Sequence, residues 1–358
     1  MVIILTEQAF SSSYWCSQYL KGINAEAKRK NIDTLITADI SDVDLYQDIT
    51  CAILIGTSLS WLHKTIEVLR AKDIKAVVLS AQKSQGFGSG VSFITMDYED
   101  ALDKLIHYFE SIGRSRTALF SVNPDSATDQ SKRSAYLSAK PTHKEEDIYY
   151  FQATLDEVCR QLYDNIDRYD SVICTNHISE IVLSKFLSEQ GYRIPEDMHI
   201  AVFGDSEVER GDRMIENTLI RIKPKEAGKL AVRSVRLLSN YPELSRVSFS
   251  ICCDIITKDG VIDLSSNKPH PLQKEKIGNA PSSADVSSAL IHEKILCNCD
   301  RVDIEILKGI IKHESYAKIA SRVHISENTI GYRIKRLMQF AGATSKEEMI
   351  EALDTYLN

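Results

Sequence analysis

Residues 168–205 read RYDSVICTNHISEIVLSKFLSEQGYRIPEDMHIAVFGD, and this stretch decides the fold class. Two short apolar runs that contain β-branched residues, Ser171–Cys174 and His199–Phe203, flank a helical stretch over Ile178–Gln190. Each run is short enough for a buried strand, and the helical stretch is long enough for a crossover helix. A strand–helix–strand unit of this kind predicts a parallel sheet and therefore an α/β fold.

The same alternation of strands and helices runs through the amino-terminal part of the chain. Further buried strands are expected over Val2–Leu5, Thr34–Thr37, Ala52–Ile55, Ala76–Leu79 and Thr117–Val122. Further helices are expected over Tyr14–Lys30, Leu59–Ala71, Tyr98–Ile112, Thr154–Ile166 and Pro224–Leu238. This pattern predicts a doubly wound parallel sheet, in which ligands bind at the carboxyl ends of the strands.

Three motifs resemble the effector-binding domain of LacI/GalR-type repressors, which is itself similar to periplasmic sugar-binding proteins. They are Thr175-Asn176-His177, the Gly191–Asp197 loop with Ile194-Pro195, and Val202-Phe203-Gly204-Asp205. Leu219–Pro224 looks like the crossing strand of that family. The resemblance implies a periplasmic-binding-protein-like domain over residues 1–261, with two doubly wound lobes. Lobe 1 is expected at about 1–113 and 222–245, and lobe 2 at about 114–221 and 246–261.

The resemblance also implies a ligand site between the lobes. The residues at the matching positions are Trp15 for stacking, Asp97, Asn176 and Asp205 for hydrogen bonds, and Lys132 or Arg133 as the cation. Aromatic stacking with several polar contacts suits a hydroxylated molecule, so the expected effector is sugar-like or another polar metabolite. Gly204, His177 and Lys132 depart from the family pattern. Asn and Asp are also favoured as caps in loops, which is the alternative role for these residues.

Residues 313–336 read HESYAKIASRVHISENTIGYRIKR and predict two helices around a polar break. Ser326 stands where the second helix needs an N-cap. If Ile330, Ile334 and Leu337 face inward, the opposite face carries Asn328, Tyr332, Lys335, Arg336 and Gln339. Five basic residues and one acid between Lys318 and Arg336 give a local charge of +4. This pattern predicts a helix-turn-helix whose basic edge meets double-stranded DNA.

The segment resembles the LuxR-type (GerE-like) DNA-binding domain of bacterial regulators. The matching residues are Val302–Leu307, Ser315–Ala320 and Ser326-x-x-Thr329-Ile330, and Lys346–Ile350 begins a fourth helix that pairs subunits in this family. We expect Asn328, Tyr332 and Lys335 at base edges, and Arg322, Arg333 and Arg336 at phosphates, with Thr329 beside them. Gly331 stands where the family has a basic residue and lowers helix propensity.

The charge distribution separates the two parts of the chain. Of 358 residues with a net charge of −7, residues 300–358 hold nine basic and nine acidic residues. All net negative charge therefore lies on residues 1–299, which disfavours a second nucleic-acid surface there. Residues 262–290, rich in Ser, Pro, Lys and Asn, predict a solvated linker. The DNA-binding domain is expected at 291–358, in place of the amino-terminal headpiece of the LacI family.

No stretch approaches eighteen uninterrupted apolar residues, and the apolar start at Met1–Leu5 is too short for a signal peptide. A cytoplasmic protein without membrane contact is expected. Eight cysteines without a regular framework indicate reduced, buried thiols. Cys297 and Cys299, near His292, offer a metal or redox site as an alternative. Structural zinc usually takes four ligands at longer, paired spacings, so we expect no metal and no cofactor.

These observations predict a sequence-specific, homodimeric transcription regulator modulated by a small molecule. A phospho-acceptor receiver needs an acidic pair after the first strand and an Asp at the end of the third. It is excluded because Leu5 is followed by Thr6-Glu7-Gln8, which has a single acid, and Ile55 by Gly56-Thr57-Ser58, which has no Asp. No phosphate loop, nucleophile elbow or carboxylate cluster with metal-ligand spacing indicates an enzyme. The alternative is a ligand-binding or interaction protein whose carboxyl-terminal helices only mediate dimerisation.

Overall fold

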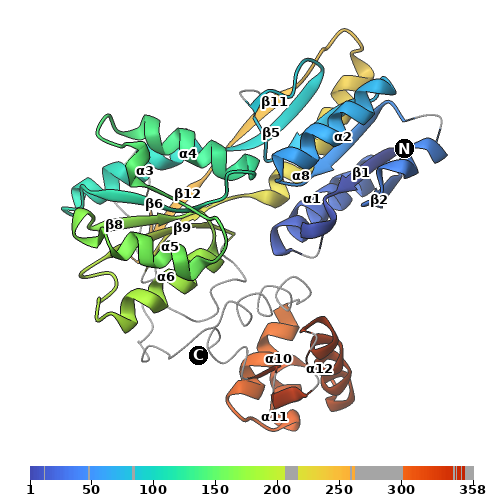
Figure 1. Ribbon diagram of the computed structural model, residues 1–358. Coiled ribbons are helices and arrows are strands. Elements are labelled where there is room, and N and C mark those ends of the chain that lie inside the picture. The colour runs from blue at the N-terminus through green and yellow to red at the C-terminus, as the bar shows by residue number, and fades with distance from the viewer. Residues whose placement is uncertain are drawn as a thin grey trace.

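The computed structural model confirms an α/β body and a separate set of carboxyl-terminal helices (Figure 1). It describes residues 1–11, 13–46, 49–82, 85–205, 217–258, 260–262, 301–341, 343, 345–347 and 349–350. The expected linker at 262–290 lies outside these residues apart from its first position, and so do Cys297 and Cys299. None of the helices in the described part of the chain combines the length and apolar character that a bilayer crossing requires.

The first sheet has six strands in the order β11-β5-β4-β3-β1-β2, and every neighbouring pair is parallel. Its strands are β1 (Val2–Thr6), β2 (Thr34–Thr37), β3 (Cys51–Ile55), β4 (Lys75–Leu79), β5 (Val91–Asp97) and β11 (Ser248–Cys252). The helices of this lobe are α1 (Tyr14–Lys30), α2 (Leu59–Ala71) and α8 (Pro224–Asn240), and the short helices are η1 (Gln8–Phe10) and η2 (Ile40–Leu45).

The second sheet has seven strands in the order β13-β12-β10-β9-β8-β6-β7. Its strands are β6 (Thr117–Val122), β7 (Ile148–Tyr150), β8 (Ser171–Cys174), β9 (His199–Gly204), β10 (Thr218–Arg221), β12 (Asp254–Thr257) and β13 (Gly260–Ile262). The five strands from β7 to β10 are parallel, and β12 and β13 extend the sheet antiparallel. The helices of this lobe are α3 (Tyr98–Ser111), α4 (Ala127–Ala139), α5 (Leu155–Tyr163) and α6 (His177–Glu189), with η4 (Glu145–Asp147) and η5 (Ile166–Arg168).

Both sheets are covered by helices on two faces. Successive residues of a strand point to opposite sides of the sheet, so each strand contributes to the cores on both faces. In β1, Ile4 packs in the core under α1 and α8, whereas Ile3 and Leu5 pack in the core under α2. In the second lobe, one core holds α3 and α4 and the other holds α5 and α6. The resulting three-layer lobes explain why inner strands such as β3 and β9 are buried along their whole length rather than on alternate residues.

Helices α1 and α8 approach each other at two glycines. A Cβ on Gly22 would lie 2.0 Å from the carbonyl oxygen of Lys225, and one on Gly228 would lie 2.2 Å from that of Tyr19. Any other side chain at these positions would push the helices apart. Gly22 and Gly228 therefore set the distance between the first and last helices of lobe 1.

The chain passes between the lobes at three places, and two differ from the boundaries expected near 113 and 246. The first passage lies at Asp97, because α3 follows β5 at once and packs against α4 and β12 of the second lobe (Figure 1). The second lies between Arg221 and Pro224. The third lies at Cys253, because β11 pairs with β5 in the first sheet and β12 with β10 in the second.

Three carboxyl-terminal helices, α10 (Arg301–Ile311), α11 (Tyr316–Val323) and α12 (Glu327–Ala341), share a core of their own (Figure 1). That core holds Ile306, Leu307, Ile310, Ile311, Ile319, Ala320, Ile330, Ile334, Leu337 and Met349. The expected inward residues of α12 are all buried, which confirms the helical phase read from the sequence.

Candidate functional site

The two lobes meet at the carboxyl ends of their strands, where the sequence predicted a ligand site. The loop after β3 contacts the loop after β6 through main-chain hydrogen bonds. Leu59 N donates to Asp125 O over 2.7 Å, and Ala127 N donates to Thr57 O over 2.7 Å. The Asp125 carboxylate also accepts from Ser60 N at 3.1 Å and from Ser60 Oγ at 2.9 Å. We call these contacts the inter-lobe latch.

Glu7, directly after β1, holds the lobe 1 side of the latch. Its buried carboxylate accepts from the backbone of Thr57 at 2.9 Å and of Ser58 at 3.1 Å, and from the Ser58 hydroxyl. A Cβ on Gly56 would lie 2.6 Å from the Trp61 ring and 2.8 Å from Glu7 Oε2, so the loop packs tightly against both groups. The sequence indicated none of these partners, because Glu7 and Ser58 are 51 positions apart.

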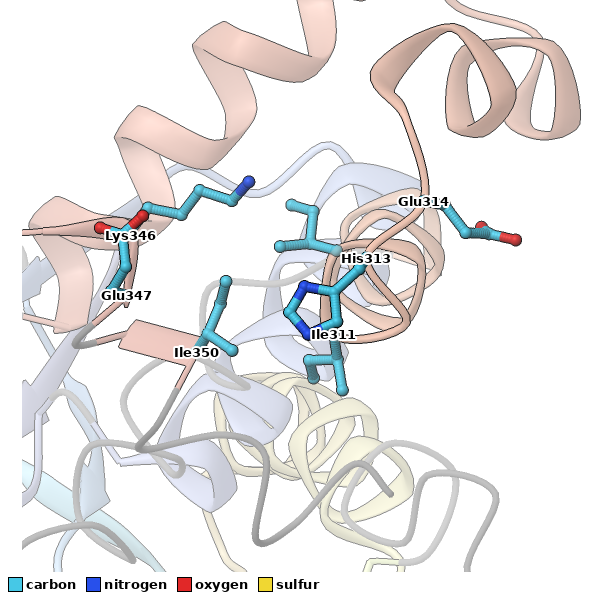
Figure 2. A pocket seen from close by; sticks show the side chains of 7 residues that line it. Ile311, His313, Glu314, Lys346, Glu347 and Ile350 are labelled. Atoms are coloured by element: carbon cyan, nitrogen blue, oxygen red, sulfur yellow. The ribbon is translucent and has the colours of Figure 1, made fainter.

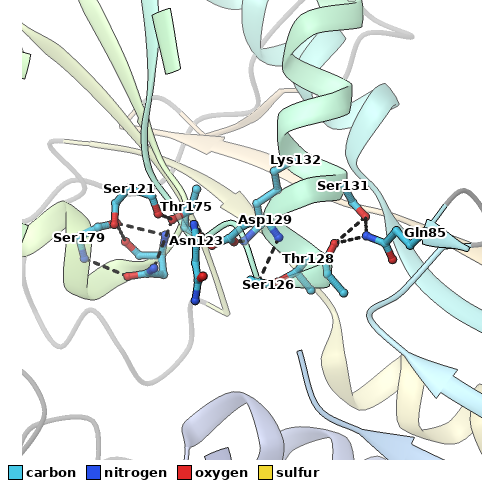
Figure 3. A network of polar contacts seen from close by, with 12 residues as sticks. Gln85, Ser121, Asn123, Ser126, Thr128, Asp129, Ser131, Lys132, Thr175 and Ser179 are labelled. Carbon is cyan, nitrogen blue, oxygen red and sulfur yellow. Dashed lines mark hydrogen bonds and ion pairs between the residues drawn. The ribbon is translucent and has the colours of Figure 1, made fainter. Parts of the chain in front are cut away.

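A second inter-lobe contact comes from Gln85 of lobe 1. Gln85 Nε2 donates to Ala127 O over 2.5 Å and to Ser131 Oγ over 3.3 Å. Figure 3 shows Gln85 reaching the first turn of α4, where Ser126, Asp129 and Lys132 continue the polar network. The latch and Gln85 thus hold the lobes together at the start of the same helix.

The ammonium group of Lys132, the expected cation of the ligand site, is held by other groups of the protein. Its Nζ donates to Asp129 Oδ1 at 3.0 Å and to Thr175 O at 2.8 Å, and the residue is 7% exposed. The same Nζ lies 5.1 Å from the centre of the Phe203 ring and 5.8 Å from that of Tyr98. A carboxylate, a carbonyl and two aromatic rings form a complete site for an ammonium group. Lys132 occupies it.

The other expected ligand residues lie in different surroundings. Trp15 is half-buried at the start of α1, between Phe10 and Tyr19, with ring centres at 5.8 and 6.0 Å. Asp97 and Asn176 are N-caps: Asp97 accepts from Asp100 N at 3.1 Å, and Asn176 accepts from Ser179 N at 2.9 Å. Both side chains therefore have the capping role that the sequence offered as the alternative to ligand binding.

Arg133 and Asp205 differ in where they lie. The Arg133 side chain extends to β7, at the edge of the second sheet. There its Nε donates to Tyr150 Oη at 2.7 Å, and its guanidinium pairs with Glu145 at 2.5 Å. Asp205, half-buried after β9, is close enough to Tyr19 of the other lobe to affect its ionisation. Burial raises the pKa of Tyr19 to about 12, and the charge of Asp205 adds to this rise. Tyr19 therefore stays neutral and shares a 2.7 Å hydrogen bond with Ser80.

Helices α11 and α12 are joined by a short turn with caps at both ends. His324 adopts the left-handed conformation at φ 56° and ends α11. Ser326 Oγ accepts from Thr329 N at 3.1 Å, as the N-cap prediction required, and shares a 2.8 Å hydrogen bond with the Thr329 hydroxyl. Of the residues expected at base edges, Asn328 and Lys335 are exposed, and Tyr332 is 69% exposed.

The residues expected at phosphates are paired with acids. The buried Asp303 of α10 holds Arg333 Nη1 at 2.7 Å and Arg336 Nη2 at 2.5 Å. Arg322 pairs with Glu314 at 2.5 Å, and Lys318 pairs with the same carboxylate at 2.9 Å. The local charge of +4 counted along the sequence is therefore reduced in three dimensions by Asp303 and Glu314.

A cavity of about 470 Å³ lies at the end of α10 in the same unit. Figure 2 shows it between the end of α10 and the segment that begins at Lys346. Its lining residues are Ile310, Ile311, His313, Glu314, Lys346, Glu347 and Ile350. Among the described residues, no group of three or more His, Cys, Asp or Glu side chains is arranged to hold a metal ion.

Comparison with known proteins supports the architecture. No family model and no curated protein matches the chain. Among solved structures, the transcriptional regulator CelR–cellobiose complex matches with a TM-score of 0.61 at 14% identity, over 72% of this chain and 82% of that chain. The body has the fold of LacI-type effector domains.

Two further structures extend this comparison. A LacI family regulator from Chloroflexus aggregans has a TM-score of 0.59 at 17% identity, over 73% of this chain and 99% of that chain. A LacI family regulator from Enterococcus faecium with bound ribose has a TM-score of 0.57 at 16% identity, over 76% of this chain and 100% of that chain. In both comparisons, the share of this chain that is matched is close to the share that the LacI-like body occupies.

Proposed function

We propose that the protein is a transcription regulator that binds double-stranded DNA through α11 and α12. The observation that carries the proposal is the outward face of α12. Asn328, Tyr332 and Lys335 share that face and are exposed, while the inward face is fixed on an apolar core. An amide, a phenol and an ammonium are side chains that read base edges in the major groove. A helix that only dimerises presents apolar residues instead.

Four residues have less direct roles in this proposal. Thr329 supports the start of α12 through Ser326. The ion-paired Arg322, Arg333 and Arg336 orient the helices, and we assign them to positioning rather than to base contact. Sequence discrimination then rests on Asn328, Tyr332 and Lys335, with Asn suited to adenine and Lys to guanine.

The LacI-like body is proposed to control DNA binding as a cytoplasmic homodimer without a metal or a cofactor. Among the regulators with a similar fold, one was solved with cellobiose and one with ribose. For this chain we propose a sugar-like or other polar effector that reaches Trp15, Asp97, Asn176 and Asp205. Lys132 contributes through Asp129 and the aromatic rings, and Arg133 lies at the sheet edge, outside the proposed contact set.

A second candidate is an interaction protein whose carboxyl-terminal helices only mediate dimerisation. The pairing of Lys318, Arg322, Arg333 and Arg336 with acids favours it, because such pairing lowers the charge available to phosphates. The two candidates make opposite predictions for DNA retention at low salt.

The test uses the full-length protein and a fluorescent duplex of mixed sequence, with anisotropy recorded between about 50 and 200 mM salt. We expect binding that weakens steeply with salt. Lys335→Ala should weaken it, whereas Lys312→Ala, at another exposed lysine of the same unit, should leave it nearly unchanged. Absence of any retained duplex at the lowest salt would remove the DNA-binding proposal in favour of the second candidate.

A further inference from the structure

Asp303 is a buried carboxylate shared by two arginines of α12. It lies in the first turn of α10 with an exposed fraction of 0%. Its Oδ1 is 2.7 Å from Arg333 Nη1, and its Oδ2 is 2.5 Å from Arg336 Nη2. We call this arrangement the Asp303 clamp.

The clamp holds the arginines on one flank of the proposed recognition helix. Arg333 and Arg336 are three positions apart, so they are neighbours along one edge of the outward face that carries Lys335. The arginine side chains are 22% and 34% exposed. They are therefore within reach of solvent beside the outward face, but their charge is directed at Asp303.

The second observation concerns Arg336 itself. Its Nε is buried and finds no hydrogen-bond partner among the residues that the structure describes, although the same guanidinium reaches Asp303 through Nη2. A guanidinium that leaves one donor unsatisfied is positioned by its strongest partner, which is the carboxylate. If Arg336 turned outward toward a phosphate, the buried carboxylate of Asp303 would lose one of its two guanidinium partners, which is unfavourable.

We infer that Asp303 withholds Arg333 and Arg336 from DNA phosphates and so limits the sequence-independent affinity of α12. This inference rests on the proposed DNA binding. Phosphate contacts supply most non-specific affinity, while base contacts supply specificity. Because Asp303 of α10 holds these two cations, DNA binding by α12 depends more on Asn328, Tyr332 and Lys335. Asp303 is thus a positioning residue that raises discrimination between sequences.

The test measures the salt dependence of duplex binding for four full-length proteins: wild type, Asp303→Asn, the triple variant Asp303→Asn/Arg333→Gln/Arg336→Gln, and Lys335→Gln. The slope of log affinity against log salt counts the phosphates neutralised, at about 0.9 per contact. Asp303→Asn frees two arginines, so its slope should steepen by about 1 to 2 and its low-salt affinity should rise. The triple variant leaves no buried charge unpaired and should keep the wild-type slope.

The variants also separate the possible failures. A triple variant whose slope falls by about 2 relative to wild type would show that the arginines already contact phosphates, and would overturn the inference. The inference is also overturned if Asp303→Asn and the triple variant bind alike, because the freed arginines would then add no phosphate contact. If wild type binds no duplex but Asp303→Asn does, the clamp stands and the proposed function fails. If neither binds, both fail. Hydrogen exchange of the α12 amides checks folding, and the triple variant carries the test if Asp303→Asn unfolds.

Discussion

Lys132 Nζ lies 3.0 Å from Asp129 Oδ1, and both side chains are 9% exposed. Lys132 is the residue that the resemblance to LacI-type effector domains placed at the ligand site, and its helix α4 begins at the main-chain hydrogen bonds of the inter-lobe latch. The carboxyl ends of the strands therefore hold an internal ion pair and main-chain contacts between the lobes. Under the proposed function, an effector competes with both.

Removing the ammonium should destabilise the body. Lys132→Ala leaves Asp129 as a buried, uncompensated charge, at a cost of about 3–5 kcal/mol in the free energy of unfolding. Lys132→Met/Asp129→Asn should cost much less, because it removes both charges. Urea denaturation of the full chain measures each value. If Lys132→Ala is as stable as Lys132→Met/Asp129→Asn, Lys132 does not compensate the charge of Asp129.

The Lys132 site also predicts chemical rescue. Methylammonium should stabilise Lys132→Ala, since the carboxylate, carbonyl and rings of the site remain, and it should leave wild type unchanged. Thermal unfolding with methylammonium chloride and with sodium chloride at equal ionic strength separates binding from a salt effect. Equal responses of both proteins would contradict the prediction.

Glu7 should determine how firmly the latch is held. Glu7→Ala removes three hydrogen bonds to Thr57 and Ser58 and should cost about 1–3 kcal/mol locally. Faster hydrogen exchange is expected at residues 57–60 and 125–127, together with a larger radius of gyration by X-ray scattering. Glu67→Ala, at an exposed glutamate of α2, is the control. Unchanged exchange in both loops would show that the latch does not depend on Glu7.

His199 should make lobe 2 sensitive to acid. Burial lowers its pKa to about 4, from an ordinary value of 6.5, and Nε2 is 2.9 Å from Thr218 Oγ1. The unfolded chain thus binds the proton more readily between these two values, so stability is complete above pH 6.5 and falls toward pH 4. The loss should approach, at most, about 3 kcal/mol. His199→Gln should flatten this part of the stability profile, whereas His107→Gln, at an exposed histidine, should not.

Gly331 leaves room for a side chain on α12. Apart from the backbone of its own helix, no heavy atom of the described residues lies within 4 Å of a Cβ built there. Gly331→Ala should stabilise the helix by about 1 kcal/mol, and Gly331→Lys should in addition tighten duplex binding at low salt. Thermal unfolding and anisotropy measure the two effects. If Gly331→Lys binds DNA no better than Gly331→Ala, this position does not face phosphates.

Local pattern predicted much of the body. The bounds of α1 and α2 were predicted to the residue, because a long amphipathic stretch between turn residues has one helical solution. Helix α4 was missed, since its sequence ATDQSKRSAYLSA is mostly polar and small and buries few large groups. The strands β5, β7, β11, β12 and β13 were also missed: β7 and β13 are only three residues long, and β11 is only partly buried.

The sequence by itself determined which side of each helix is apolar. Ile330, Ile334 and Leu337 face the core and Tyr332 faces out, because backbone geometry fixes the period within a few residues. Only the tertiary structure decided which charges remain available. Arg333 meets Asp303 from 30 positions away, and Lys132 meets Thr175 from 43. Such pairings depend on how elements pack, and an ion pair formed in this way removes a charge that a count along the chain treats as free.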